Sequence, residues 1–287
     1  MGWEERFRLD GKVAVVTGAS YGLGATFATS LADAGADIAI CARSREGLES
    51  TAKAVEALGR RCYIEQVDVT QWEQVDGFVQ NTIRELGKID VMVNNAGITD
   101  ARGLRSENVE FEAMDDVIAV DLKGFWYSTR AVAPHMLRRG SGSIINISSI
   151  LGTAAAEIRS IGYIAAKGAV NNLTKFLGVE WGDRNVRVNA IAPNFFMSEM
   201  TEEILTQLGM KDWSESRTPM RRLGVDEDLI GPIIFLASDA SSYVNGEILH
   251  VDGGWAAGAG THQRHPHVHD SWDPGGGGHP ILPESSS

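Results

Sequence analysis

Residues 13–24 read Val13-Ala14-Val15-Val16-Thr17-Gly18-Ala19-Ser20-Tyr21-Gly22-Leu23-Gly24, an apolar β-branched run that leads directly into a glycine-rich turn. The run predicts a buried strand, and a helix is expected from Gly22 to Ala34, closed by Gly35. A glycine turn that feeds a helix points free N–H groups and the positive end of the helix dipole at an anion. We therefore expect a dinucleotide phosphate to bind here. A tight turn without a ligand is the alternative, because the spacing G-x-x-x-G-x-G differs from the more familiar G-x-G-x-x-G.

Short β-branched runs and longer helical runs alternate along the rest of the chain. Strands are expected at Val13–Thr17, Asp37–Ala42, Cys62–Gln66, Ile89–Asn94, Ser143–Ser148, Val186–Ile191 and Glu247–Val251. Helices are expected at Gly22–Ala34, Glu46–Leu58, Gln71–Leu86, Tyr163–Glu180 and Asp226–Ala237, and one more helix ends near Arg139. This alternation predicts an α/β, doubly wound fold of Rossmann type, with a seven-stranded parallel sheet and helices on both faces of a single domain.

The composition of the chain excludes several classes of partner. Its 287 residues carry a formal net charge of −12 and no arginine-rich run, so nucleic acid is not expected to bind. No stretch of about 18 residues is apolar and uncharged throughout, as a membrane-spanning helix would be. The charged start of the chain lacks the apolar core of a signal peptide, so we expect a cytoplasmic protein that does not enter a membrane. Cys41 and Cys62 lack metal-ligand spacing and are expected to be buried, reduced thiols.

Two segments depart from the alternation of strands and helices. Residues 195–222 form a long insert rich in large apolar side chains, which we expect to be a lid over the substrate; a helical pair that only packs on its neighbours is the alternative. Residues 256–287 contain Gly275–Gly278 and five histidines, and we expect them to be a disordered tail outside a catalytic domain of residues 1–255. No dedicated metal site is expected in this tail.

Tyr163 and Lys167 are four residues apart in a predicted helix, so their side chains project from one face. A neighbouring ammonium favours phenolate and lowers the pKa of a tyrosine from about 10 towards neutrality. A phenol with such a pKa can give and take a proton near pH 7. The spacing is common when taken alone, and a surface pair is the alternative.

The residue that follows the second predicted strand bears on the choice of cofactor. An acidic residue at this position accepts a hydrogen bond from the adenosine ribose 2′-hydroxyl and repels a 2′-phosphate. This chain has Ala42 and then Arg43, whose guanidinium can bind a phosphate with two hydrogen bonds. We therefore predict a preference for NADP(H) over NAD(H).

From about Leu9 to Trp255, the chain resembles the short-chain dehydrogenase/reductase family. The resemblance rests on Thr17–Gly24, Asn94-Asn95-Ala96-Gly97, Ser149, Tyr163 and Lys167. It implies an NAD(P)(H)-dependent oxidoreductase that interconverts a secondary alcohol and a ketone by hydride transfer, and a homotetramer or homodimer. A non-catalytic dinucleotide-binding sensor is the competing class, and the complete catalytic set argues against it.

The resemblance also implies a role for each matching residue. Tyr163 would be the acid in ketone reduction and the base in alcohol oxidation, Ser149 would hold the substrate oxygen, and Lys167 would bind the nicotinamide ribose and depress the tyrosine pKa. Asp121 occupies the position that completes the catalytic tetrad. Cofactor contacts are expected from Gly18, Ser20, Tyr21, Gly22, Leu23, Gly24, Arg43, Asp68, Val69, Asn95, Ala96, Gly97, Tyr163, Lys167, Pro193 and Ser198, and no metal is expected.

Three residues depart from the family pattern. Asp121 stands where the family has an asparagine whose main-chain carbonyl holds a water in a proton relay, and its added carboxylate could perturb the site. Asn194 replaces a flexible glycine after Pro193. Tyr21 stands at a position that is often occupied by a small or basic residue. The adenosine end of the site therefore lacks a second cation, which weakens the case for NADP(H).

Two substrate classes are compatible with the sequence. Residues 7–12, 36–38 and 251–255 resemble the branch of the family that contains gluconate 5-dehydrogenases and 2-deoxy-gluconate 3-dehydrogenases, and this branch grades into 3-oxoacyl-carrier-protein reductases. The pocket mouth is expected to include Arg102, Arg105 and Arg159, which could receive a carboxylate or simply be solvated surface charge. The apolar insert instead favours a lipophilic ketone.

Overall fold

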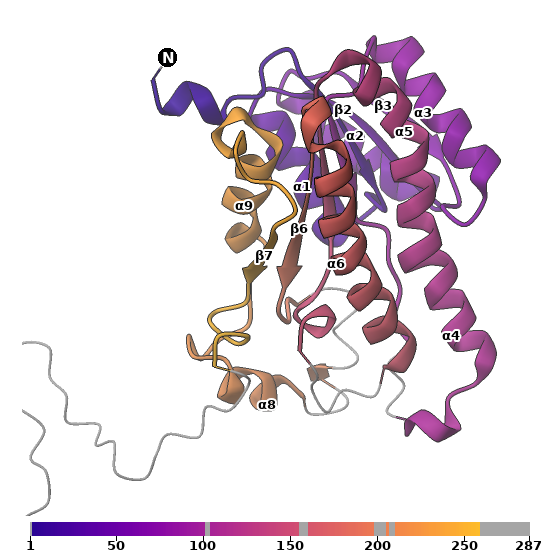
Figure 1. The fold of residues 1–287 in the computed structure, drawn as a ribbon, viewed down its shortest axis with the longest axis vertical. Helices are drawn as coiled ribbons and strands as arrows, with labels where there is room; N and C mark the ends of the chain where they lie inside the picture. The colour runs from indigo at the N-terminus through magenta and orange to yellow at the C-terminus, as the bar shows by residue number, and fades with distance from the viewer. Residues whose placement is uncertain (1, 101–103, 155–159, 198–204, 207–209, 259–287) are drawn as a thin grey trace, which may run out of the picture.

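The central sheet of the protein has seven strands, all parallel, in the order β3-β2-β1-β4-β5-β6-β7. The architecture comes from a computed structural model that describes residues 2–100, 104–154, 160–197, 205–206 and 210–258 (Figure 1). The strands are β1 (Val13–Thr17), β2 (Asp37–Ala42), β3 (Cys62–Gln66), β4 (Val91–Asn94), β5 (Gly142–Ile147), β6 (Val186–Pro193) and β7 (Ile248–Val251). The strand order reverses beside β1, and open α/β sheets bind ligands outside the carboxyl ends of the strands at such a switch point.

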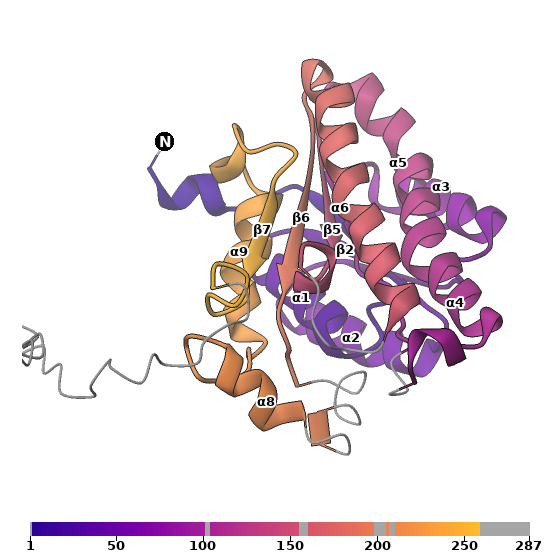
Figure 2. The same ribbon diagram turned by 60° about the horizontal axis from the view of Figure 1, so that its bottom comes forward.

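Helices cover both faces of this sheet, as predicted. They are α1 (Gly22–Asp33), α2 (Arg45–Ala57), α3 (Trp72–Leu86), α4 (Phe111–Val117), α5 (Phe125–Arg139), α6 (Ile161–Trp181), α8 (Met210–Arg217) and α9 (Glu227–Ala237). Figures 1 and 2 show α1, α2 and α9 on one face and α3, α5 and α6 on the other. A seven-residue π-helical turn, η3 (Ile118–Gly124), joins α4 to α5.

Alternate side chains of the strands fill two separate cores. In β1, Ala14 and Val16 pack with α1, α2 and α9, whereas Val13 and Val15 pack with α3, α5 and α6. Successive strand residues point to opposite faces, so a sheet covered on both sides needs a continuous apolar run. This is why Val13–Val16 is entirely apolar and entirely buried.

The predicted element boundaries agree with the structure to within two residues for the strands. β1, β2 and β3 match, β4 begins at Val91 instead of Ile89, and β6 continues to Pro193 because its last residue still pairs with Val251 of β7. Within the described residues, no helix is long and apolar enough to cross a membrane. The same residues contain no group of three histidine, cysteine or acidic side chains arranged to hold a metal ion.

The described part of the apolar insert forms a small core of its own beside the sheet edge. Phe195 and Trp213 meet edge to face with ring centroids 6.4 Å apart, and Leu205 and Trp255 are fully buried in the same cluster. Figure 2 shows α8 below the carboxyl ends of β6 and β7. The five histidines of the tail lie in residues 259–287, outside the described residues.

Candidate active site

A cavity of about 520 Å³ opens at the carboxyl ends of the strands. Loops that follow β1 to β6 all contribute to its wall, together with α6 and η3. Its lining contains Gly18, Ser20, Tyr21, Gly22, Leu23, Gly24, Arg43, Asp68, Val69, Asn95, Ala96, Gly97, Asp121, Ser149, Tyr163, Lys167 and Pro193. The structure thus gathers in one place every predicted site residue that it describes. Ser198 lies outside the described residues.

The glycine turn forms one end of this cavity and has no room for a side chain at Gly18 or Gly24. Gly18 has φ +66°, and a Cβ there would lie 2.7 Å from Ala96 Cα; a Cβ on Gly24 would lie 2.2 Å from the carbonyl oxygen of Gly18. Asn95 fixes the turn by donating from Nδ2 to the carbonyl of Thr17 at 2.9 Å, while its own amide donates to Thr17 Oγ1 at 3.0 Å. A bare backbone next to a helix amino terminus fits a dinucleotide phosphate.

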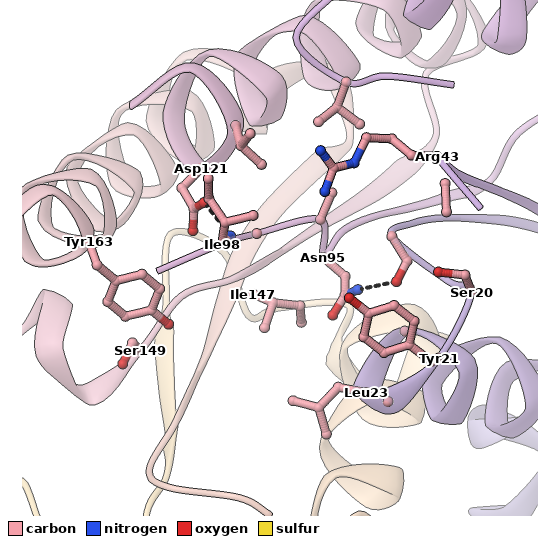
Figure 3. A pocket seen from close by; sticks show the side chains of 18 of the residues that line it. Ser20, Tyr21, Leu23, Arg43, Asn95, Ile98, Asp121, Ile147, Ser149 and Tyr163 are labelled. Atoms are coloured by element: carbon pink, nitrogen blue, oxygen red, sulfur yellow. Dashed lines mark hydrogen bonds between the residues drawn. The ribbon is translucent and has the colours of Figure 1, made fainter. Parts of the chain in front are cut away.

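Arg43 and Tyr21 lie at the same end of the cavity, away from Tyr163 and Ser149 (Figure 3). Both are exposed, and the Arg43 side chain has no hydrogen bond or ion pair with another described residue. Its backbone is held instead, because Gln66 Nε2 donates to the Arg43 carbonyl at 2.8 Å. The guanidinium therefore remains available to a ligand.

Ser149, Tyr163 and Lys167 form the opposite end of the cavity. Tyr163 is partly buried, and its hydroxyl points towards Ser149 (Figure 3). Lys167 is 3% exposed and donates to the carbonyl of Ile147 at 3.0 Å. Its ammonium also lies 5.3 Å from the centroid of the Tyr163 ring. A phenol, a hydroxyl and a cation thus lie together; the helix spacing predicted the phenol and the cation, and the family resemblance implied the hydroxyl.

Asp121 brings a fourth group to this end, from the π-helical turn η3. Its carboxylate is fully buried: Oδ1 accepts the amide of Ile98 at 2.8 Å, and Oδ2 lies 3.0 Å from Lys167 Nζ. The well-directed hydrogen bond of the ammonium goes to Ile147, so the approach to Oδ2 is mainly an ionic contact. The net shift in the pKa of Asp121 is upward, with burial as its largest cause and Asp100 adding to it, whereas Lys167 and the Ile98 amide act against it because both contacts stabilise the carboxylate.

The expected depression of the Tyr163 pKa is wrong for this arrangement. Burial is the largest influence and raises the pKa of Tyr163, Lys167 lowers it as predicted, and Asp121 raises it again; the net shift is upward. Burial acts to lower the pKa of Lys167, but the neighbouring Asp121 and Tyr163 raise it by more than burial lowers it. The net shift is upward, so the ammonium stays charged. The helix spacing reveals the cation but not its buried counter-ion.

Comparisons with known proteins decide the family. The family model described as "Enoyl-(Acyl carrier protein) reductase" matches residues 18–256. Gluconate 5-dehydrogenase of Gluconobacter oxydans is 39% identical over 257 residues, covering 88% of this chain and 98% of that protein. The 3-oxoacyl-[acyl-carrier-protein] reductase FabG of Thermotoga maritima is 38% identical over 86% of this chain and 98% of its own length. This chain belongs to the short-chain dehydrogenase/reductase family.

A solved structure of the same family agrees with the fold. Gluconate 5-dehydrogenase from Burkholderia cenocepacia, in complex with NADP and tartrate, superposes with a TM-score of 0.85 at 37% identity. The match covers 89% of this chain and 99% of that one. The predictions of a Rossmann-type fold and of an oxidoreductase acting on an alcohol–ketone pair are therefore confirmed, and a non-catalytic sensor is not favoured.

One residue of this short-chain dehydrogenase/reductase site was missed by the sequence analysis. Asp100 is 5% exposed and holds the first turn of α6, because Oδ2 accepts the amide of Gly162 at 2.8 Å and Oδ1 accepts the amide of Tyr163 at 3.3 Å. The hydroxyl of Ser160 donates to the same carboxylate. Asp100 thus fixes the backbone that carries the phenol. No local pattern reveals this, since 62 residues separate Asp100 from Gly162.

The departure at Asn194 has a structural explanation. Its Nδ2 donates to Thr218 Oγ1 at 3.0 Å and to the carbonyl of Asp252 at 3.2 Å, so the side chain ties β6 to the segment before α9 and to the loop after β7. Asn189 has a structural role as well: its Nδ2 donates to the carbonyl of Val244 at 2.9 Å, and its Oδ1 accepts the amide of Glu247 at 3.0 Å.

Proposed function

We propose that this enzyme interconverts a ketone with an apolar substituent and its secondary alcohol, uses NADP(H), and transfers the substrate proton through Tyr163. One observation carries the proposal: a single cavity has a bare glycine cradle and Arg43 at one end and Ser149, Tyr163 and Lys167 at the other. A cofactor with its phosphates on the cradle would span the cavity towards the phenol. The order of groups suits a dinucleotide and a carbonyl substrate placed end to end.

The residues at the Tyr163 end would move the proton and hold the reacting oxygen. Bound NADP(H) would supply or accept the hydride. Ser149 and Tyr163 both place a hydroxyl where a carbonyl oxygen can accept two hydrogen bonds, which stabilises negative charge as it develops. Tyr163 then donates its proton to the alkoxide in reduction and withdraws it in oxidation. Lys167 offsets part of the cost of forming the phenolate and has donors left for ribose hydroxyls.

NADP(H) is the proposed cofactor because the exposed Arg43 guanidinium has no other described partner. The structure from Burkholderia cenocepacia in complex with NADP supports this choice. Replacing Arg43 by Asp should weaken NADPH binding most and leave NADH binding nearly unchanged, because the substituted carboxylate repels the 2′-phosphate alone. The Km for both cofactors tests this, and a clear preference of the unmodified enzyme for NADH would refute it.

The apolar core beside Tyr163 supports a substrate with an apolar substituent. Phe195 and Trp255 belong to this core, and Tyr163, Ile164 and Trp213 pack against it. Of the three arginines that could receive a carboxylate, Arg105 is exposed, and Arg102 and Arg159 lie outside the described residues. Removing an apolar substituent from water against aromatic side chains contributes about 25 cal/mol per Å² buried. A 3-oxoacyl thioester has such a substituent, whereas a sugar acid does not.

The decisive experiment is a panel of ketones, assayed by NADPH oxidation, with the Tyr163→Phe variant alongside the unmodified enzyme. We expect 3-oxoacyl thioesters and other lipophilic ketones to outperform 5-ketogluconate, and Tyr163→Phe to lose at least about a hundredfold in kcat while NADPH binding stays intact. Turnover of Tyr163→Phe at the unmodified rate would defeat the assignment of the acid. A preference for the sugar acid would overturn the proposed substrate and leave the proton chemistry standing.

We further propose a homotetramer or homodimer in the cytoplasm. On α5 and α6, Trp126, Phe176 and Val179 are exposed by 40%, 60% and 84%, and such apolar side chains suit a contact between subunits. Cys41 and Cys62 are free thiols, which fits a reducing compartment. Light scattering that shows a monomer would refute the assembly.

A further inference from the structure

We propose that the Asp121 carboxylate is a counter-ion to Lys167 that keeps the Tyr163 phenol protonated, and thereby sets the pH range in which the enzyme works. This inference rests on the proposed function, in which Tyr163 transfers the substrate proton. Asp121 is then a positioning residue, because it acts on Tyr163 through Lys167 and through its own charge without touching the substrate.

The surroundings of Asp121 show that the site accommodates a carboxylate. The side chain is fully buried, its two oxygens face the amide of Ile98 and the ammonium of Lys167, and a Cβ on Gly97 would lie 2.9 Å from Oδ2. Glycine at position 97 therefore leaves the space that the carboxylate occupies. A buried carboxylate without a charged partner would cost several kcal/mol, so its pairing with Lys167 fixes both side chains.

Pairing changes what Lys167 does for its other neighbour. The ammonium lies 3.0 Å from the Asp121 carboxylate and 5.3 Å from the centroid of the Tyr163 ring. An isolated cation at that distance would favour phenolate, whereas a cation with a carboxylate at its side presents a nearly neutral pair. Phenolate formation would place a second negative charge in the same buried cluster, and the phenol is therefore held in its protonated form.

Other described groups around this cluster do not replace Asp121 in this role. The loop after β4 contributes Asp100, a second carboxylate that raises the pKa of Asp121, and α4 contributes Asp116 to the cavity wall. From β5 and its following turn comes the hydroxyl of Ser149, and α5 supplies the ring of Phe125, 4.6 Å from the ammonium. Lys167 is the single cation among these groups in the described residues that line the Tyr163 end.

The expected change of rate with pH depends on which protonation form of Tyr163 each direction of the reaction needs. Reduction needs the protonated phenol, so its rate holds below the Tyr163 pKa and falls as pH rises through it. Oxidation needs phenolate, so its rate rises through the same pKa. An opposite charge at 4–6 Å lowers a pKa by about 1–3 units, and the carboxylate offsets part of that. Replacing Asp121 by Asn should therefore move both transitions down by about one pH unit.

The test measures this transition in two independent ways. The first is kcat/KM against pH in both directions for the unmodified enzyme, Asp121→Asn and Asp121→Ser, with exposed Asp115→Asn as a control that removes one charge from the neighbouring α4. The second is an ultraviolet titration of tyrosinate, with Tyr163→Phe subtracted, which needs no substrate. An asparagine that turned its amide NH2 towards the Lys167 ammonium would not fit, whereas the smaller serine would. Testing both variants therefore separates loss of the carboxylate from misfolding.

We expect the Tyr163 transition above its ordinary value of about 10 in the unmodified enzyme and about one unit lower in both Asp121 variants, with Asp115→Asn unchanged. At neutral pH, oxidation by the variants should rise by up to about tenfold. A transition well below 10 in the unmodified enzyme, or no shift in a folded Asp121 variant, would overturn the inference. Absence of turnover with every ketone would sink the proposed function instead, since the tyrosinate titration would still report the proton affinity.

Discussion

Replacing Gly24 by Ala tests whether the glycine turn is a cradle that tolerates no side chain. A Cβ at this position would lie 2.2 Å from the carbonyl oxygen of Gly18, 2.6 Å from Asn95 Nδ2 and 2.9 Å from Ala19 Cα. Two of these atoms belong to the backbone, so the first turn of α1 must move. Overpacking of this kind costs about 1–3 kcal/mol, against a gain of at most about 1 kcal/mol from the better helix propensity of alanine.

A net loss of about 1 kcal/mol corresponds to a fall in Tm of about 2–4 °C for a domain of this size. The displaced turn should also weaken NADPH binding by at least about tenfold, measured by isothermal titration calorimetry, because the amides no longer converge on the phosphates. The matched control is Gly77→Ala in α3, where a Cβ meets no atom within 4 Å. That variant should gain about 1 kcal/mol and bind NADPH as before. Unaltered Tm and affinity in Gly24→Ala would refute the cradle.

Three further changes test other parts of the molecule. Burial acts to raise the pKa of Asp90, but the hydrogen bond from Arg139 and the other partners of the carboxylate hold this pKa below its ordinary value. The carboxylate therefore stabilises the fold above a pH of about 4, and this stabilisation is lost as the pH falls through the folded pKa. Asp90→Asn should therefore lower Tm at pH 7, in calorimetry at a series of pH values, and the difference should disappear in acid; a constant difference would contradict this. Asp100→Ala removes the carboxylate that caps α6, and we expect it to cost about 1 kcal/mol of stability and to lower kcat, because the backbone of Tyr163 loses a partner; an unchanged kcat would show that Asp100 does not position the phenol. Trp213→Ala should raise the KM for a lipophilic ketone by about tenfold or more and leave the Km for NADPH unchanged, and equal effects on both would point to misfolding.

The sequence was sufficient for those features that depend on neighbours in the chain. The apolar run Val13–Val16 predicted a strand covered on both faces. The glycines after it predicted the cradle, because few other residues tolerate the positive φ at Gly18 or the close backbone approach at Gly24. The spacing of Tyr163 and Lys167 placed both on one helix face because an α-helix repeats every 3.6 residues. These are local rules, and the structure agrees with each of them.

Tertiary structure alone decided the electrostatics of the site. Asp121 reaches Lys167 from a different helix, and Asp100 caps α6 across 62 residues, so neither contact leaves a periodic trace in the sequence. The cation four residues away predicted a lowered pKa for Tyr163, whereas the fold removes much of the phenol from water, places a carboxylate beside the cation and raises that pKa. Helix periodicity is set by backbone hydrogen bonds a few residues apart, but a proton affinity depends on every charge within several ångströms, whatever its position in the chain.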